Sequence, residues 1–330
     1  MAPLPLTLAC WNYDRTRALA DGRVRPDGIA LTYLTLPVEE TFFRMIRHRE
    51  FEAAELSLSS YVISLCQPDP PFVAIPVFPS RSFRHSCIYL HAASGIRQPG
   101  DLVDKRVGSP EFQLTACVWI RGLLADDYGV PIDAVTYVTG GQEEPGRREK
   151  IRLDLPASIR IERIAADATL SALLERGDID ALYTPRLPST FRGGGGRIRR
   201  LFEDYPQVER DYFRRTGIFP IMHVIAIRRD VYDRHRWIAQ SLQKAFAAAQ
   251  RDTYDDLAET AALKTMLPWL TAHVEETRRE MGVDFWPYGL DRNRHTLATF
   301  LRYSHEQGLA TRLLTPEELF APEALESFKI

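Results

Sequence analysis

The sequence predicts a two-lobed α/β protein that ends in a set of helices. Apolar runs typical of strands alternate with helix-like segments through most of the chain, and two longer strand-like runs stand where the character of the sequence changes. At 330 residues the chain also exceeds the roughly 250–300 residues at which a single core usually stops growing. We therefore expect two lobes rather than one.

Composition excludes several classes of protein. Hydrophobic residues make up 45% of the chain and charged residues 26%, which are ordinary globular values. The 42 basic and 44 acidic residues give a net charge of −2, unlike a strongly basic nucleic-acid-binding protein. No apolar run approaches the ~20 residues of a membrane-spanning helix. We expect a soluble protein with a sizeable core and with no nucleic-acid or membrane partner.

The first lobe is predicted from the start of the chain. We expect strands over residues 6–11, 30–36, 53–56 and 72–77, and helices over residues 13–20, 39–47 and 59–65. Such alternation is typical of a parallel sheet with helices on both faces. Ligands of these sheets bind beyond the carboxyl ends of the strands, so the loops after these strands are the first candidates for a site.

A second α/β lobe is predicted between two long strands, expected over residues 84–91 and 219–227. Its elements are a turn at 100–108 that leads into a strand, helices over 113–128 and 168–176, and strands over 135–138 and 179–183. Residues 233–319 are mostly helical. This layout places residues 1–90 and 220–330 in lobe 1, and residues 91–219 in lobe 2.

Cysteine and glycine patterns argue against cofactor motifs. The four cysteines (Cys10, Cys66, Cys87 and Cys117) show no Cys-x-x-Cys spacing, so we expect reduced thiols in a cytoplasmic protein. No basic residue precedes Cys10, which favours a first strand over a secretory signal. Gly193–Gly196 lack the context of a phosphate loop, and we interpret residues 185–200 as a mobile solvated loop rather than a nucleic-acid patch. We expect no organic cofactor.

The predicted layout resembles the type II periplasmic-binding-protein fold, in which two crossover strands join two α/β lobes. The segment LLERGDIDA at residues 173–181, where a helix ends at a glycine and a strand follows, is similar to the second lobe of those proteins. Solute receptors, effector domains of transcription factors and a few enzymes share this fold. The fold alone therefore does not decide the function.

Several segments also carry a family resemblance. They lie at residues 13–19, 22–24, 26–29, 56–61, 76–86 (PVFPSRSFRHS), 216–223 (TGIFPIMH), 267–269 (LPW), 281–289 (MGVDFWPYG) and 302–309 (RYSHEQGL). As a set they resemble the 4,5-dihydroxyphthalate decarboxylase family over nearly the whole chain. The resemblance implies cofactor-independent removal of one carboxyl group from a dihydroxylated phthalate, which gives protocatechuate and CO₂ in aromatic-acid catabolism.

Two other functions stay open. A non-catalytic solute-binding protein could hold an aromatic or dicarboxylic ligand in the same cleft, and a biosynthetic enzyme or effector-binding protein could hold an unrelated small ligand. We expect that the protein is not exported, because no signal peptide is present. We also expect that it is not a transcription factor, because no DNA-binding helix-turn-helix segment precedes the first strand.

The implied reaction defines the groups that a site needs. One carboxylate of the substrate lies para to a ring hydroxyl, and deprotonating that hydroxyl lets the carbon bearing the carboxylate accept a proton before CO₂ leaves. A group with a pKa near the working pH transfers protons best, which favours histidine. Arginine suits the carboxylate that stays, because its two nitrogens match the two carboxylate oxygens.

The candidate catalytic residues are His85, His223 and Asp14. His85 is expected at the start of the first crossover strand and His223 on the return strand, so both imidazoles should reach the floor of the cleft. Asp14 follows the first strand and is a reserve acid or base, as is Glu111. A satisfied core histidine is the alternative for His223. We expect no metal, with a site of His85, Glu55 and His223 as the alternative.

The candidate substrate-binding residues lie at predicted strand ends and at the lobe junction. They are Arg81 and Arg84, expected to clamp the carboxylate that stays, together with Tyr13, Ser57, Ser59, Ser60, Glu111, Gln113 and Arg186. Ordinary capping, turn or hinge contacts are the alternative for each. Only five of the 42 basic residues are lysine, so an arginine near a site is weak evidence by itself.

Self-association is the expected use of the C-terminal helices. Their aromatic residues Trp269, Trp286 and Tyr288 are predicted to be exposed, and exposed apolar surface is typical of an interface. We therefore expect a homo-oligomer, with packing of these residues onto their own lobe as the alternative.

Overall fold

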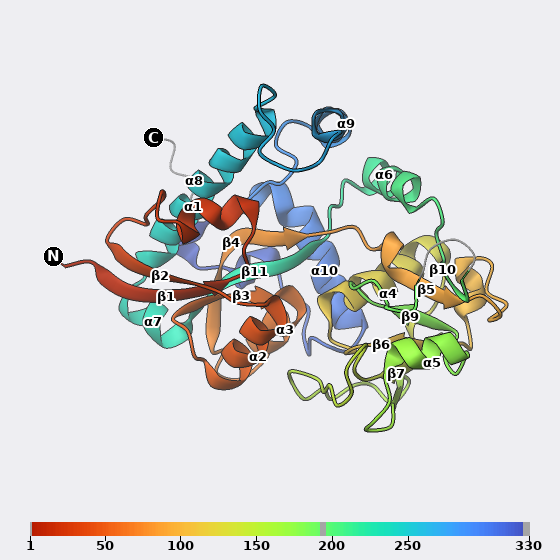
Figure 1. The fold of residues 1–330 in the computed structure, drawn as a ribbon. Coiled ribbons are helices and arrows are strands. Elements are labelled where there is room, and N and C mark those ends of the chain that lie inside the picture. The colour runs from red at the N-terminus through yellow and green to blue at the C-terminus, as the bar shows by residue number, and fades with distance from the viewer. Residues whose placement is uncertain (1, 192–195, 326–330) are drawn as a thin grey trace. The chain divides into compact units, whose positions relative to one another are not determined.

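The computed structural model describes residues 2–191 and 196–325, which fold into two compact units. Unit 1 comprises Met1–Arg81, His223–Ala298 and Leu314–Ile330, and unit 2 comprises Ser82–Met222 and Thr299–Leu313. Each unit is built on its own sheet (Figure 1). Three residues of the predicted glycine loop, Gly193–Gly195, lie outside the described residues.

Unit 1 has a five-stranded sheet with the order β2-β1-β3-β11-β4. Its strands are β1 (Leu4–Cys10), β2 (Ile29–Thr35), β3 (Ala53–Ser57), β4 (Phe72–Arg81) and β11 (Ile221–Arg228). β1 is parallel to β2 and β3, whereas β11 is antiparallel to β3. The ends of β1 and β3 and the beginning of β11 therefore meet at one edge of the sheet.

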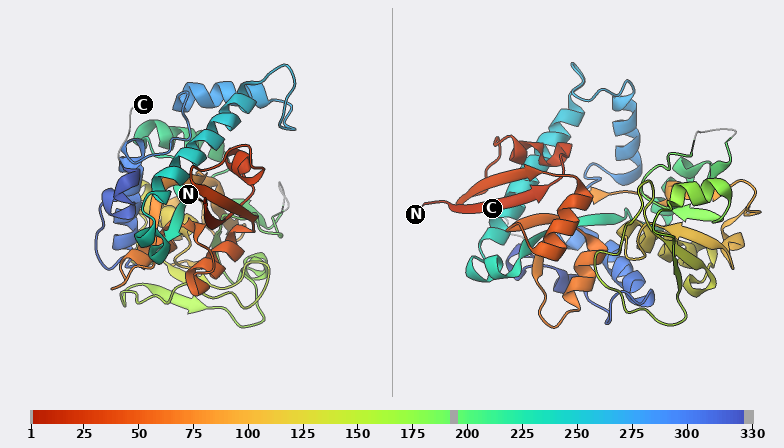
Figure 2. Two further views of the ribbon diagram at one scale, coloured as in Figure 1. Left: turned by 90° about the vertical axis from the view of Figure 1, so that its left-hand side faces the viewer. Right: turned by 60° about the horizontal axis from the view of Figure 1, so that its bottom comes forward.

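The helices of unit 1 cover this sheet. They are α1 (Arg17–Ala20), α2 (Val38–His48), α3 (Leu58–Leu65), α7 (Arg229–Arg234), α8 (Ile238–Ala258) and α9 (Leu270–Met281). α8 contributes Leu242, Ala245 and Phe246 to the main core, where they join apolar residues of β1, β4 and β11. α9 lies beside α8 and buries only Leu270 and Val274 among its twelve residues (Figure 2).

Unit 2 has a six-stranded sheet with the order β10-β5-β9-β6-β7-β8. Its strands are β5 (Ile88–His91), β6 (Arg106–Ser109), β7 (Thr136–Thr139), β8 (Arg160–Arg163), β9 (Ala181–Tyr183) and β10 (Ile198–Arg200). Its helices are α4 (Thr115–Tyr128), α5 (Leu170–Arg176) and α6 (Tyr205–Thr216), and it also takes the second half of α10 (Arg294–Glu306). Parallel pairing of β6 with β7 and β9 places the ends of these three strands at one edge.

The buried helix α4 organises the core of unit 2. Trp119 packs against Phe300 and Tyr303, with ring centroids 5.4 and 5.6 Å away, and its indole N–H donates to the Ile221 carbonyl at 2.9 Å. Gly122 faces the ring of Tyr303 so closely that a Cβ atom there would overlap the ring. The contact between α4 and α10 therefore depends on a glycine.

We expect Gly122→Ala to lower the free energy of unfolding by ~1–3 kcal/mol, the usual cost of overpacking a core. The added methyl group must push the Tyr303 ring or the helix aside, because ring atoms already occupy its position. Urea unfolding measures the change. Gly100→Ala is the matched control, since nothing lies within 4 Å of its added Cβ; equal stability of the two variants would contradict this packing.

The prediction of a first crossover strand over residues 84–91 is wrong. β4 continues through Arg81, whereas residues 84–87 are not a strand: His85–Cys87 form a 3₁₀ turn and β5 begins at Ile88. Pro76 and Pro79 interrupt the apolar pattern, yet β4 tolerates them because it lies at the edge of its sheet. His85, which was expected at the start of the crossover strand, therefore lies in the turn before β5.

The unit boundaries also differ from those expected. Residues 82–90 belong to unit 2 because β5 pairs with β9 and β10, and residues 299–313 belong there because Tyr303 and Gln307 contact α4. Residues 220–222 likewise fall in unit 2. Pairing and packing across the chain decide these boundaries, and a linear pattern does not contain them.

Candidate active site

A buried carboxylate forms the centre of the candidate site in unit 1. Glu55 lies in β3, is wholly buried, and has only apolar or small residues on either side in its strand. Its oxygens accept hydrogen bonds from four groups, which are Cys10 Sγ (3.5 Å), the Trp11 backbone N–H (3.0 Å), the Tyr13 hydroxyl (2.6 Å) and His223 Nδ1 (2.6 Å). A carboxylate out of water needs this degree of hydrogen bonding to remain ionised.

Sheet geometry explains why these four groups meet. β1 and β3 are adjacent and parallel, so the residues that end β1 and follow it lie beside the middle and end of β3. In the antiparallel pair of β3 and β11, Ser57 is opposite His223 and Glu55 is opposite Ile225. Glu55 and His223 are therefore diagonal neighbours on the same face of the sheet.

The charges of the cluster follow from its contacts. Burial alone would raise the pKa of Glu55, but His223 and the hydrogen bonds from Tyr13 and Trp11 hold that pKa below its ordinary value. Burial and the neighbouring Glu55 raise the pKa values of the Tyr13 hydroxyl and the Cys10 thiol well above their ordinary values. Glu55 is thus the anion, and Tyr13 and Cys10 are neutral donors.

His223 is the residue that connects the cluster to its surroundings. An ionised Glu55 can only accept, so the imidazole must donate through Nδ1. Within the described chain Nε2 has no hydrogen-bond partner, and the side chain keeps 16% of its surface exposed. The edge of the ring contacts Phe42, with centroids 4.8 Å apart. Of the two ring nitrogens, Nδ1 is thus the one engaged with Glu55.

The structure brings three of the predicted site residues to this cluster, namely Tyr13, Ser57 and His223. Ser57 lies opposite His223 and caps α3 by accepting from the Ser60 backbone N–H at 3.5 Å. Ser59 and Ser60 are buried in the first turn of α3. Their expected role in substrate binding stays a prediction.

Asp14 lies outside the cluster. Its half-exposed carboxylate pairs with Arg15 at 3.0 Å. The Arg15 guanidinium stands between the rings of Tyr13 and Trp286, 4.2 Å from each centroid, and donates to the Pro79 carbonyl at 2.6 Å. Arg15 thus packs on the face of the Tyr13 ring, whose hydroxyl donates to Glu55, and Asp14 pairs with Arg15.

The two predicted clamp arginines have internal partners in different units. Arg81, in unit 1, donates to the Asn293 side chain and to the Pro287 carbonyl at 2.9 Å, and its burial lowers its pKa to about 9. Arg84, in unit 2, contacts Met222 Sδ at 3.1 Å and Cys87 Sγ at 3.6 Å. Their expected grip on a substrate carboxylate stays a prediction.

His85 is enclosed in unit 2. Its side chain lies between the rings of Phe202 and Tyr212, at 5.4 and 5.1 Å, and burial lowers its pKa to about 4. The imidazole is therefore neutral at pH 7. Since His223 lies in unit 1, the expected approach of the two histidines stays a prediction.

The predicted residues of unit 2 lie near the ends of β6 and β9. Glu111 is buried in an ion cluster with Lys150 Nζ at 2.6 Å and Arg147 Nη2 at 2.6 Å, which lowers its pKa against the opposing effect of burial. A low pKa does not suit the reserve proton donor that we predicted. The exposed Arg186 contributes backbone hydrogen bonds to Gln142 and Thr184.

A carboxylate of the chain itself, that of Glu149, contacts the predicted substrate-binding residue Gln113. Glu149 accepts from the backbone N–H groups of Phe112 (2.5 Å) and Gln113 (3.4 Å) and from Gln113 Nε2 (2.9 Å). The expected role of Gln113 in binding a substrate stays a prediction. The sequence did not indicate Glu149, Arg147 or Lys150, because they lie more than thirty positions from their partners.

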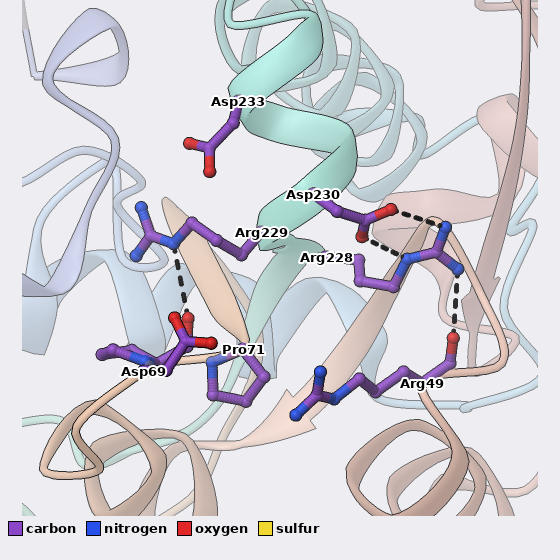
Figure 3. Close-up of a pocket in the computed structure, with 8 residues that line it drawn as sticks. Arg49, Asp69, Pro71, Arg228, Arg229, Asp230 and Asp233 are labelled. Carbon is purple, nitrogen blue, oxygen red and sulfur yellow. Dashed lines mark hydrogen bonds and ion pairs between the residues drawn. The ribbon is translucent and has the colours of Figure 1, made fainter.

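A surface hollow of about 470 Å³ lies elsewhere in unit 1, at the start of α7 (Figure 3). Among its charged side chains, Arg228 pairs with Asp230 at 2.5 Å, and Arg229 donates to the Phe72 carbonyl at 3.1 Å. It holds none of the predicted site residues. In the described part of the chain no three His, Cys, Asp or Glu side chains are grouped as metal ligands.

Comparison with solved structures defines the class of protein. The chain is similar to the periplasmic aliphatic sulphonate-binding protein SsuA of Escherichia coli (TM-score 0.54, 12% identity, 98% of this chain and 99% of that one). It is also similar to the desulfurization enzyme DSZB (TM-score 0.50, 13% identity, 98% and 97%). The predicted periplasmic-binding-protein-like fold is confirmed. No helix among residues 2–191 and 196–325 is long and apolar enough to cross a bilayer.

Sequence comparison is more specific. No family model matches the chain. It is 42% identical to the 4,5-dihydroxyphthalate decarboxylase of Comamonas testosteroni over 330 residues, which is the full length of both chains. It is 44% identical to that of Pseudomonas putida over 214 residues, or 65% of this chain and 83% of the relative. The chain therefore belongs to the 4,5-dihydroxyphthalate decarboxylase family.

Proposed function

We propose that this protein is a decarboxylase that converts 4,5-dihydroxyphthalate to protocatechuate and CO₂ without oxidation. The observation that carries the proposal is the full-length identity of 42% to a relative of that name. The site in unit 1 supports it, because the Glu55–His223 pair supplies a proton-transfer group of the kind this reaction needs. A non-catalytic binding protein has no need of such a pair.

The reaction requires one proton at the ring carbon that loses its carboxylate. The para hydroxyl first gives up its proton, and electron density from that oxygen lets the ring carbon form a new C–H bond. The C–C bond to the carboxylate then breaks, its electron pair restores the aromatic ring, and CO₂ leaves. The phenolate is reprotonated, so the reaction takes up one proton in total.

His223 is the proposed donor of the ring proton. Its Nε2 carries the transferable proton when the imidazole is charged, and Glu55 stabilises that charge at Nδ1. After this transfer, the imidazole can take up a new proton from solvent, since part of its side chain is exposed. Tyr13 is a proposed substrate contact through its ring, and its hydroxyl is engaged with Glu55.

Incubation with 4,5-dihydroxyphthalate tests the function. We expect CO₂ and protocatechuate in equal amounts, with no added cofactor. Phthalate is the matched control: it keeps both carboxylates but lacks the para hydroxyl, so it should bind without losing CO₂. Binding of 4,5-dihydroxyphthalate without turnover would contradict the proposal and favour a solute-binding protein.

We also propose that the protein self-associates and works in the cytoplasm. Met266, Trp269 and Val283 are 103%, 71% and 76% exposed, which supports an interface in the region of α9. Trp286 and Tyr288 are partly buried rather than exposed, because Trp286 donates to the Phe78 carbonyl and Tyr288 packs against the core of unit 1. Four free cysteines favour a reducing compartment.

A further inference from the structure

We infer that Glu55 is a positioning residue, which fixes the tautomer and the orientation of His223 for proton transfer. This inference rests on the proposed function and assigns a role to a residue that does not touch the substrate. Glu55 is wholly buried and its two oxygens are both engaged, so it has no surface on which to meet a ligand. Any contribution to catalysis must pass through its partners.

The cost of burying Glu55 argues for such a contribution. An ionised carboxylate in a protein core is expensive unless a charge or several hydrogen bonds compensate for it. No lysine or arginine in the described chain forms an ion pair with Glu55, and its one ion-pair partner there is His223. A glutamine or an apolar residue at this position of β3 would avoid the free-energy cost of burying a charge.

The other groups around Glu55 identify His223 as its charge partner. From β1 and the loop after it come the neutral Cys10 thiol and Tyr13 hydroxyl. From β2 comes Tyr33, whose hydroxyl donates to the Trp11 carbonyl at 3.0 Å. Arg15 lies over the face of the Tyr13 ring, and Phe42 of α2 contacts the imidazole. Among the donors to Glu55, His223 is the one able to carry a positive charge near neutral pH.

Geometry fixes the direction of the proton. The 2.6 Å contact between Nδ1 and Glu55 Oε1 holds a hydrogen on Nδ1, so a neutral His223 has its lone pair on Nε2. Packing of Phe42 against the imidazole limits rotation of the ring. The proton that His223 gives or takes therefore passes through Nε2, which is the nitrogen that faces away from Glu55.

The first test is Glu55→Gln, which preserves shape but removes the charge. We expect kcat to fall on the order of 10²-fold, within the usual contribution of general acid–base catalysis, with KM changed by less than about threefold. The pH–rate profile should also change, because the carboxylate that contacts Nδ1 of His223 has lost its charge. Glu52→Gln is the matched control: this half-exposed carboxylate also accepts from a β1 backbone N–H, at 2.9 Å, but does not contact His223.

Two outcomes would overturn the positioning role. One is a Glu55→Gln variant that is less stable than the wild type yet keeps kcat and an unmoved pH–rate profile, which is the behaviour of a structural carboxylate. The other applies even if this variant does not fold: nitrogen NMR of wild-type His223, recorded without substrate, that shows the hydrogen of the neutral ring on Nε2 rather than Nδ1.

These measurements separate the inference from the proposed function. If the wild-type protein releases no CO₂, the decarboxylase proposal fails, while the NMR result still decides whether Glu55 fixes the tautomer. If the wild type is active and Glu55→Gln matches it, the positioning role fails and the decarboxylase proposal stands. Tyr13→Phe adds a further readout, since it removes one hydrogen bond to Glu55 but leaves its charge, and should leave the pH–rate profile in place.

Discussion

His223→Asn is expected to lower turnover by about 10²–10⁴-fold, the range that a positioned acid or base contributes. Protonating an aromatic carbon breaks aromaticity, so the donor matters most at this step. Asparagine keeps a polar side chain near Glu55 but cannot carry the transferable proton. Binding of 4,5-dihydroxyphthalate should be largely retained, because Nε2 acts on the reacting carbon rather than on the carboxylate that stays.

Steady-state kinetics and the pH–rate profile measure this effect. The variant should lose the limb that His223 contributes, whereas a His273→Asn control on the exposed part of α9 should keep both limbs. Full turnover with an unchanged profile in His223→Asn would remove this residue from the mechanism. His85→Asn would then be the next variant to test, although its burial lowers the pKa of that imidazole to about 4.

Much of the fold of unit 1 could be predicted, because local pattern determines it. The strands β1 to β3 and the helices between them follow from apolar runs of the right length, and together with β11 these strands place Tyr13, Ser57 and His223 near one edge of a sheet. The apolar pattern gave wrong predictions at two places. β4 is longer than expected because two prolines are tolerated in an edge strand, and a turn replaces the expected strand at residues 84–87.

The contacts at the centre of the site, around Glu55, were harder to predict from the sequence. Glu55 gave one local signal, a single carboxylate within an apolar strand, but its partners lie 42 to 168 positions away. The ion cluster of Glu111 gave no signal, because Arg147 and Lys150 stand in an irregular segment whose path depends on tertiary contacts. Contacts between residues so far apart in the sequence follow from the packed structure, and the periodicity of the sequence does not contain them.

The Glu111 cluster should make one of the largest contributions to the stability of unit 2. The Lys150 side chain is fully buried, and both Glu111 oxygens accept hydrogen bonds from its ammonium group. Glu111→Gln removes the Glu111 charge from this buried ion cluster, and breaking a buried pair by removing one partner is costly, so the free energy of unfolding should fall by ~3–5 kcal/mol. Glu162→Gln is the control, because its ion pair with Arg106 at 2.7 Å is half exposed and is expected to contribute less than ~1 kcal/mol.

The pH dependence of this loss has a definite sign. The pKa of Glu111 is lower in the folded protein than its ordinary value of about 4.3, so folding favours the ionised form. The ion cluster thus stabilises the protein fully above that ordinary pKa and loses its effect as the pH falls through the lowered one. Urea unfolding of the wild type and Glu111→Gln should show a constant difference from pH 7 to about pH 5, which shrinks as the pH is lowered further. A difference below ~1 kcal/mol at pH 7, or one that grows in acid, would contradict this account, because breaking a buried ion pair by removing one partner is costly.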